Sequence, residues 1–70
     1  MCFYGVWVNP NEDTFWGTRI HDEVAEVIAD LLHFGEPDES DNLVVFDASG
    51  LAVRTYDLDA DAFVECGEHE

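Results

Sequence analysis

Apolar side chains fall into a few short runs along this chain, separated by turn residues. Residues 2–8, CFYGVWV, are rich in aromatic and β-branched residues, which is typical of a strand. Alternation along such a strand directs Phe3 and Trp7 to one side and the even-numbered residues to the other. The segment Asn9-Pro10-Asn11 then has the chemistry of a turn, and the pattern assigns no element to the two aromatic residues that follow it.

The clearest predicted element is a helix over residues 19–33. Its apolar side chains recur at helical spacing and form one face. These side chains are Ile20, Val24, Val27, Ile28, Leu31 and Leu32. Thr18 suits the N-cap position and Gly35 suits the helix stop. Residues 36–42, EPDESDN, follow as a polar loop with Pro37 as its breaker.

Two further strands are predicted over residues 43–48 and 51–56, joined at Ser49-Gly50 by a turn that needs glycine. The segment from Asp57 onward is ambiguous, because its alternating acids suit a strand edge and equally suit the first turn of a helix. No repeat, linker or domain boundary interrupts the pattern, so residues 1–70 are expected to form one acidic domain.

The order of strand, helix and hairpin predicts an α+β fold. It consists of a three-stranded antiparallel sheet with one amphipathic helix packed on one face. The expected core is drawn from Val6, Val8, Ile20, Val24, Val27, Ile28, Leu31, Leu32, Val44, Phe46, Leu51 and Val53. The second sheet face still carries apolar side chains, so either the C-terminal segment or another chain covers it. A homodimer is one of these alternatives, although two such subunits repel one another.

Charge changes this picture more than any motif does. The chain has 17 acids against two Arg and no Lys, which gives a formal net charge of −15. Self-repulsion at this density destabilises a compact state, so the chain either functions in screening salt or uses its field. The hydrophobic fraction of 47% excludes a disordered acidic tail. Nucleic acid and anionic lipid repel an anionic surface, so the expected partner is a basic protein, with no direct nucleic-acid or membrane binding.

Several classes of function are excluded by missing motifs. The chain has no G-x-S-x-G, no H-E-x-x-H and no Gly-rich phosphate loop, so we expect no enzyme and no cofactor. No apolar stretch approaches the ~18 residues of a membrane span, and the N-terminus lacks a secretory signal. A cytoplasmic location follows. Cys2 and Cys66 are then expected as free thiols, and Cys66 with His69 gives only half of a zinc site.

The first candidate binding residues lie on the predicted helix. Asp22, Glu26 and Asp30 stand four residues apart, with Glu23 beside them, so successive carboxylates lie about 6 Å apart along the axis. Like charges at this spacing cost a few tenths of a kcal/mol per pair, and only Arg19 offsets them. The row is either a solvated face or a partner-binding stripe. The following loop extends it with Glu36, Asp38, Glu39 and Asp41.

The C-terminal acids allow two interpretations. Asp57, Asp59 and Asp61 are candidates for the same partner-binding surface. They also match the first three ligand positions of a calcium loop, and Glu68 falls at its bidentate position, so the twelve residues from Asp57 resemble an EF-hand loop. Ala62 departs from that pattern because it replaces the glycine of the sharp turn. A weak calcium-binding module is therefore an alternative function for residues 57–68.

In size and acidity the whole chain resembles the small DNA-mimic inhibitors encoded by phages and mobile elements, including the anti-CRISPR proteins. The resemblance rests on size and charge and not on a motif, so it transfers no residue roles. It implies a non-enzymatic inhibitor that blocks the DNA or PAM site of a CRISPR effector complex. A compact chain of this length is about 28 Å across, so its net charge amounts to one per roughly 1.9 Å, close to the ~1.7 Å of duplex DNA.

Salt adaptation is the competing explanation. Absent Lys and abundant Asp, Glu, Ala and Val fit a protein from a salt-loaded cytoplasm, where the acids serve solvation and the function stays open. The two explanations differ in where they put the acids. Mimicry predicts acids clustered on one face with a bare patch elsewhere, whereas salt adaptation predicts acids everywhere.

Overall fold

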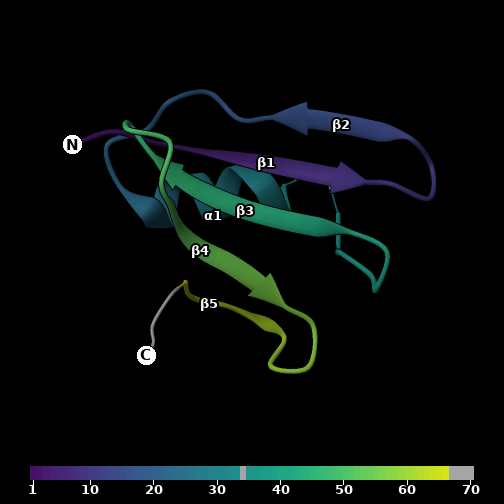
Figure 1. Cartoon of the computed structure of the whole chain (residues 1–70). Coiled ribbons are helices and arrows are strands. Elements are labelled where there is room, and N and C mark those ends of the chain that lie inside the picture. The colour runs from purple at the N-terminus through teal and green to yellow at the C-terminus, as the bar shows by residue number, and fades with distance from the viewer. Residues whose placement is uncertain (34, 67–70) are drawn as a thin grey trace.

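The computed structural model describes residues 1–33 and 35–66. Within these residues, five strands form one antiparallel sheet in the order β2-β1-β3-β4-β5, and a single helix, α1, lies against one face over β1 and β3 (Figure 1). The strands are β1 (Phe3–Asn9), β2 (Thr14–Gly17), β3 (Asn42–Asp47), β4 (Ala52–Asp57) and β5 (Ala62–Glu65). The helix spans Val24–Leu32. Within the described residues, no helix has the length and apolar character needed to cross a membrane.

The prediction of a three-stranded sheet with a helix packed on it is wrong, because two short edge strands widen the sheet to five. β2 pairs with β1, and β5 pairs with β4, each over four residues. Strands this short show too little alternation to be recognised from the sequence. Each follows a tight turn that ends in a residue with positive φ, Asp13 at 57° and Asp61 at 53°. Aspartate is one of the few residue types that tolerate this conformation.

The helix begins at Val24, later than its periodicity predicts. The chain before it continues the sheet instead, since Phe3 and His21 exchange two backbone hydrogen bonds of 2.8 Å. Thr18, the expected N-cap, also serves the sheet, because its Oγ1 accepts the N–H of Gly5 at 2.9 Å. The bonds to Phe3 satisfy the backbone N–H and C=O of His21, which a longer helix would have used.

The core lies between α1 and the sheet, where Val27, Leu31, Leu43 and Val45 are fully buried. Gly5 permits this close approach. A Cβ atom on Gly5 would lie 2.7 Å from both Val27 Cγ1 and Leu31 Cδ1, which is closer than side-chain packing tolerates. The helix therefore packs over the sheet face on which β1 has no side chain at its centre.

Nowhere in the described part of the chain does a helix cover the other face of the sheet, which we call the open face. It carries Tyr4, Val6, Val8, Phe15, Val44, Phe46 and Val64, by strand alternation and pairing register. The expected core is thus wrong for Val6, Val8, Val44 and Phe46. Ile20 and Leu51 are also outside the core, at 67% and 66% exposed, and Leu32 is partly exposed. Both faces of β1 and β3 are apolar, so the sequence pattern did not show which face belongs to the core.

The predicted orientation of the side chains along β1 is confirmed. Phe3 and Trp7 pack against the core, on the side opposite to the even-numbered residues.

Candidate functional site

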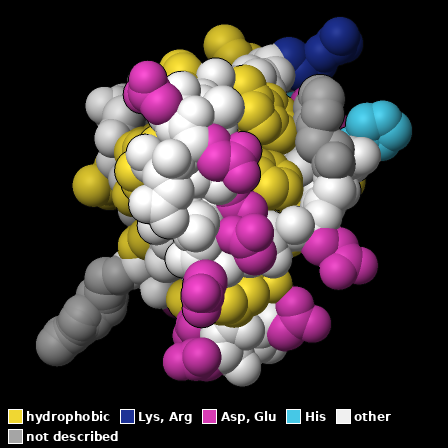
Figure 2. Space-filling model, turned by 90° about the vertical axis from the view of Figure 1, so that its right-hand side faces the viewer, with side chains coloured by type: hydrophobic (Ala, Val, Ile, Leu, Met, Phe, Trp, Pro, Cys, Tyr) yellow, Lys and Arg dark blue, Asp and Glu magenta, His cyan; other side chains and the backbone are white. Residues whose placement is uncertain are grey.

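Three chain connections meet at one end of the sheet, where β1 ends, β3 begins and β4 ends. They are residues 10–13, residues 35–41 and residues 58–61, and they lie on the right in Figure 1. Nine carboxylates gather here, eight of them in these connections and one, Asp57, at the end of β4. They are Glu12, Asp13, Glu36, Asp38, Glu39, Asp41, Asp57, Asp59 and Asp61. We call this surface the acidic end; Figure 2 looks directly at it and shows acidic side chains along its whole length.

Two of these acids shape the turns that carry them. Asp38 Oδ1 accepts the backbone N–H of Ser40 at 2.9 Å, and Asp57 Oδ1 accepts the backbone N–H of Asp59 at 3.0 Å. Both are Asx turns, in which a short side-chain oxygen replaces a backbone acceptor two residues earlier. The first carboxylate of each turn is therefore held in one position by the fold.

Asp41 fastens the long connection to β1. Its Oδ1 accepts the Nδ2–H of buried Asn9 at 2.8 Å, and its Oδ2 accepts the N–H of Asp38 at 2.9 Å. Partial burial alone would raise the pKa of the Asp41 carboxyl. The hydrogen bonds from Asp38, the Trp7 side chain and Asn9 together outweigh burial, and they hold that pKa below its usual 3.8. Asp41 is thus a fixed, ionised anchor.

Among the described residues, four acids of this end neither accept a hydrogen bond nor occupy a left-handed turn position. Within residues 1–33 and 35–66, their side chains form no hydrogen bond and no ion pair, and all four are exposed. They are Glu12, Glu36, Glu39 and Asp59, and we call them the surplus acids. Each of the three connections contributes at least one surplus acid, so these acids are distributed across the whole acidic end.

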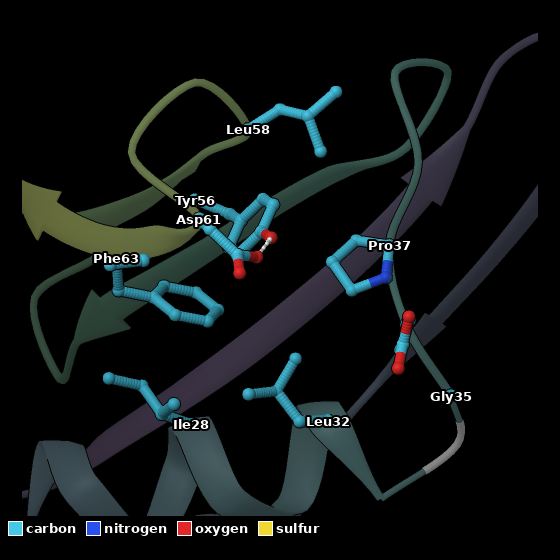
Figure 3. Close-up of a pocket in the computed structure, with 10 residues that line it drawn as sticks. Ile28, Leu32, Gly35, Pro37, Tyr56, Leu58, Asp61 and Phe63 are labelled. Carbon is cyan, nitrogen blue, oxygen red and sulfur yellow. Dashed lines mark hydrogen bonds between the residues drawn. The ribbon is translucent and has the colours of Figure 1, made fainter.

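An apolar hollow of about 790 Å³ opens at the acidic end (Figure 3). It lies between the last turns of α1, residues 35–37 and the β4–β5 hairpin. Tyr56 Oη donates a hydrogen bond to Asp61 Oδ1 at 2.6 Å beside it. This bond, together with partial burial and the negative charges of Asp61, Glu36 and Asp57, raises the pKa of Tyr56 to about 12. The hydroxyl therefore stays protonated and keeps Asp61 in place.

The predicted stripe of acids on the helix does not form. Asp22 and Glu23 precede α1, and only Glu26 and Asp30 lie within it. Asp30 Oδ2 also lies 3.0 Å from His21 Nε2, so this carboxylate has a partner already. The remaining predicted acids, from Glu36 to Asp61, do come together at the acidic end.

Positive charge lies away from the acidic end. Arg19 belongs to the connection between β2 and α1, at the opposite end of the sheet. Arg54, in β4, lies 3.8 Å from Glu65. The described part of the open face carries a single acid, Asp57, at its margin. The charge is thus segregated: one end is crowded with carboxylates, one face is almost free of them.

The two metal hypotheses gain no support from this geometry. Strand β5 begins at Ala62, where an EF-hand loop would still be turning, so residues 57–65 form a hairpin. Glu68 and His69 lie outside the described residues. Among residues 1–33 and 35–66, no group of three or more His, Cys, Asp or Glu side chains is arranged to hold a metal ion. Cys2 and Cys66 are free cysteines.

Sequence reasoning missed two members of the acidic end, Glu12 and Asp13. The sequence could have indicated them, because they lie between the Asn9-Pro10-Asn11 turn and the aromatic pair Phe15 and Trp16 of β2. Assigning Phe15 and Trp16 to a strand would have put these acids in a turn between two strands, although the neighbours of that turn depend on the strand order.

Comparison with known proteins adds no information on function. No protein-family model matches the chain, and no curated protein or solved structure matches it at a significant level.

Proposed function

We propose that this chain is a non-enzymatic inhibitor that mimics nucleic acid. In this proposal the acidic end occupies the basic DNA-binding site of a cytoplasmic partner such as a CRISPR effector complex. The observation that carries the proposal is the segregation of charge. Nine carboxylates gather at one end, while both arginines and the apolar open face lie elsewhere.

The spacing of the carboxylates supports this proposal. The molecule measures 32 × 30 Å in its two longer dimensions. Nine carboxylates projected onto such a length amount to about one negative charge per 3.4 Å, which is close to the density of about one phosphate per 3.4 Å along one strand of duplex DNA. A basic groove built for phosphates would meet charge of similar density, and the field of this end would steer the encounter.

The anchoring of the acidic end supports it too. Asp38, Asp41 and Asp57 are held by hydrogen bonds within the fold. A partner that binds this end does not have to order the turns first, so less binding free energy is lost to conformational entropy. An unstructured polyanion of equal charge lacks this advantage.

Salt adaptation remains the alternative, and the distribution of acids counts against it. Thermal melts in about 0.1 M and about 1 M potassium chloride separate the two, because the Debye length falls from about 10 Å to about 3 Å. Mimicry predicts a cooperative melt from a folded chain at the lower salt. A chain that folds only at the higher salt would favour solvation as the role of the acids.

Competition for DNA tests the proposal directly. A fluorescein-labelled duplex containing a PAM is bound to purified CRISPR effector complexes and, in parallel, to unrelated DNA-binding proteins, and its anisotropy is followed as the chain is added. We expect the chain to release the duplex from at least one of these proteins, with weaker release as salt rises. Poly-glutamate at the same carboxylate concentration is the control. Release by the chain that is absent throughout, or no better than release by poly-glutamate, would contradict the proposal.

A further inference from the structure

The hollow at the acidic end combines apolar walls with an anionic rim. Figure 3 shows Ile28 and Leu32 of α1 on one side, Phe63 of β5 beside them and Pro37 across the opening. Glu36 and Asp61 also line it. An occupant that suits both parts must have an apolar body and a positive charge.

We propose that this hollow binds an arginine side chain of the partner together with the apolar residue next to it. The inference rests on the proposed function, which supplies a basic partner, and it identifies where one of the partner's residues is recognised. Arginine packs its aliphatic stem on apolar surface while its guanidinium reaches a charged group. Arginine is also among the residues that dominate protein interfaces.

Asp61 is the group that would meet the guanidinium. It occupies a left-handed turn position with φ of 53°, and its Oδ1 is taken by the Tyr56 hydroxyl. Its Oδ2 accepts no hydrogen bond within the described residues, and Figure 3 shows the carboxylate facing the hollow. A fixed carboxylate with one vacant oxygen is a good acceptor for a charge-assisted hydrogen bond.

The aromatic wall favours the same occupant. Tyr56 and Phe63 pack edge to face with ring centroids 5.4 Å apart, and a guanidinium is attracted to aromatic faces. An anionic ligand would be repelled by Asp61 and Glu36, whose charges already act on the Tyr56 hydroxyl. The volume of about 790 Å³ exceeds what one side chain needs and lies within the usual range of ligand pockets. An apolar neighbour of the arginine fills the remainder.

The test uses short peptides as probes of the full chain, followed by amide chemical shifts in NMR spectra. The probe is acetyl-Leu-Arg-Leu-amide. Its controls are the citrulline peptide, which has the same shape without the charge, and acetyl-Gly-Arg-Gly-amide, which lacks the apolar neighbours. We expect shifts concentrated at the residues that line the hollow, and about tenfold weaker binding of each control.

Two variants with a matched control locate the site. Asp61→Asn keeps the turn conformation and the acceptor for Tyr56, and should weaken binding of the arginine peptide about tenfold. Asp13→Asn is the control, since Asp13 has the same left-handed conformation in the other hairpin turn and does not line the hollow; it should leave the affinity unchanged. Leu32→Ala removes part of the apolar wall and should weaken the leucine-containing peptide but not the glycine-containing one.

Equal binding of the arginine and citrulline peptides would overturn the inference. Shifts spread evenly over the acidic end, or equal losses in Asp61→Asn and Asp13→Asn, would overturn it as well. The DNA competition assay keeps this failure separate from failure of the proposed function. If Asp61→Asn releases DNA as well as the wild type does, the hollow is not the recognition site while mimicry stands. If the peptide binds selectively but no DNA is released, mimicry falls while the hollow stands.

Discussion

The two ends of the sheet meet the same structural need with different amounts of charge. At the end away from the acidic end, the β3–β4 turn uses one acid, Asp47, whose Oδ1 accepts the N–H groups of Ser49 and Leu51. These hydrogen bonds, with that of the Ser49 hydroxyl foremost, lower the pKa of Asp47. At the acidic end Asp38 and Asp57 build the equivalent turns, yet seven further carboxylates surround them.

This difference separates the acids that the fold uses from those that it does not. Asp38, Asp41 and Asp57 accept backbone or side-chain hydrogen bonds, and Asp13 and Asp61 occupy left-handed positions. The surplus acids do neither, and they add repulsion that disfavours the compact state. Turn chemistry therefore explains why some acids occur at this end, and binding of a basic partner, as proposed above, would account for the surplus acids.

The sheet and the helix packed on it hold both ends in place, so the largest loss of stability is expected from a change in the core between them. Leu31→Ala removes a fully buried side chain that packs over Gly5, and should lower the free energy of unfolding by about 2–5 kcal/mol. Urea denaturation measures this loss. The same change at Leu51, which is 66% exposed in the turn at the opposite end, should cost less than about 0.5 kcal/mol. Similar losses in both variants would show that the assigned core is wrong.

The next largest effect should distinguish an anchoring acid from a surplus one. The Asp41 carboxylate accepts hydrogen bonds from Asp38, Asn9 and the Trp7 side chain. Asp41→Asn replaces one of its oxygens with an N–H donor, so at least one hydrogen bond is lost and two donors face each other, which should cost about 1 kcal/mol at neutral pH. Glu39→Gln, in the same connection, removes a charge but no bond, and should leave stability equal or slightly higher. Chemical denaturation of both variants checks the contrast, which fails if Glu39→Gln is the more damaging.

The pH dependence of the Asp41 effect has a defined sign. The pKa of Asp41 is lower in the folded chain than its unfolded value of 3.8, so the folded state favours the ionised form. Its contribution is fully present above pH 3.8 and is lost as the pH falls through the folded-state pKa. The stability difference between wild type and Asp41→Asn should therefore shrink in acid, and a difference that grows in acid would contradict this assignment.

A smaller effect is expected at Tyr56, whose pKa reports the negative charge of the acidic end. Its pKa is raised to about 12, so its stabilising contribution is complete below pH 10 and is lost as the pH rises from 10 to about 12. Ultraviolet absorbance follows the phenolate, and Tyr56→Phe identifies the late-titrating group. Asp61→Asn removes the nearest charge and should lower the Tyr56 pKa. Because Asp61→Asn keeps the acceptor for the Tyr56 hydroxyl, an unaffected midpoint would mean that the negative charge of Asp61 is not a main cause of the raised pKa.

Much of the sheet was predictable from local chemistry. The runs at residues 2–8, 43–48 and 51–56 contain β-branched and aromatic residues, and Ser49-Gly50 supplies the turn, where Gly50 has φ of 91°. The edge strands were not predictable, because four residues give too short an alternation. The sequence also did not show which face of the sheet the helix covers, since this depends on contact between Gly5 and the side chains of a helix distant in the sequence.

The acidic end was predictable only in part. Composition revealed the charge, and the loop acids from Glu36 to Asp41 stood out as a group. The helical periodicity wrongly predicted a row of acids at Asp22, Glu26 and Asp30 on one helix. Ile20 continued the apolar pattern of α1, although it is exposed and lies before the helix. Bringing residues 12 and 13 to the same end of the sheet as residues 38–41 and 57–61 requires the strand order of the whole sheet, which is not a local property.

The most direct test of the central claim compares two variants that remove the same charge from different places. Glu12→Gln, Glu39→Gln and Asp59→Asn together remove one surplus acid from each connection of the acidic end. Asp22→Asn, Glu23→Gln and Glu26→Gln remove three exposed acids at the start of α1, whose side chains form no hydrogen bond or ion pair in the described part of the chain. Both variants should stay folded, and each carries three fewer negative charges than the wild type.

The two variants are compared in the DNA competition assay at one salt concentration. If the acidic end is the binding surface, the first variant should lose about 10- to 100-fold in its ability to release DNA, at up to about 1 kcal/mol per carboxylate, while the second stays close to wild type. Equal losses in the two variants would mean that net charge alone acts, and would contradict the claim that this end of the sheet is the functional surface.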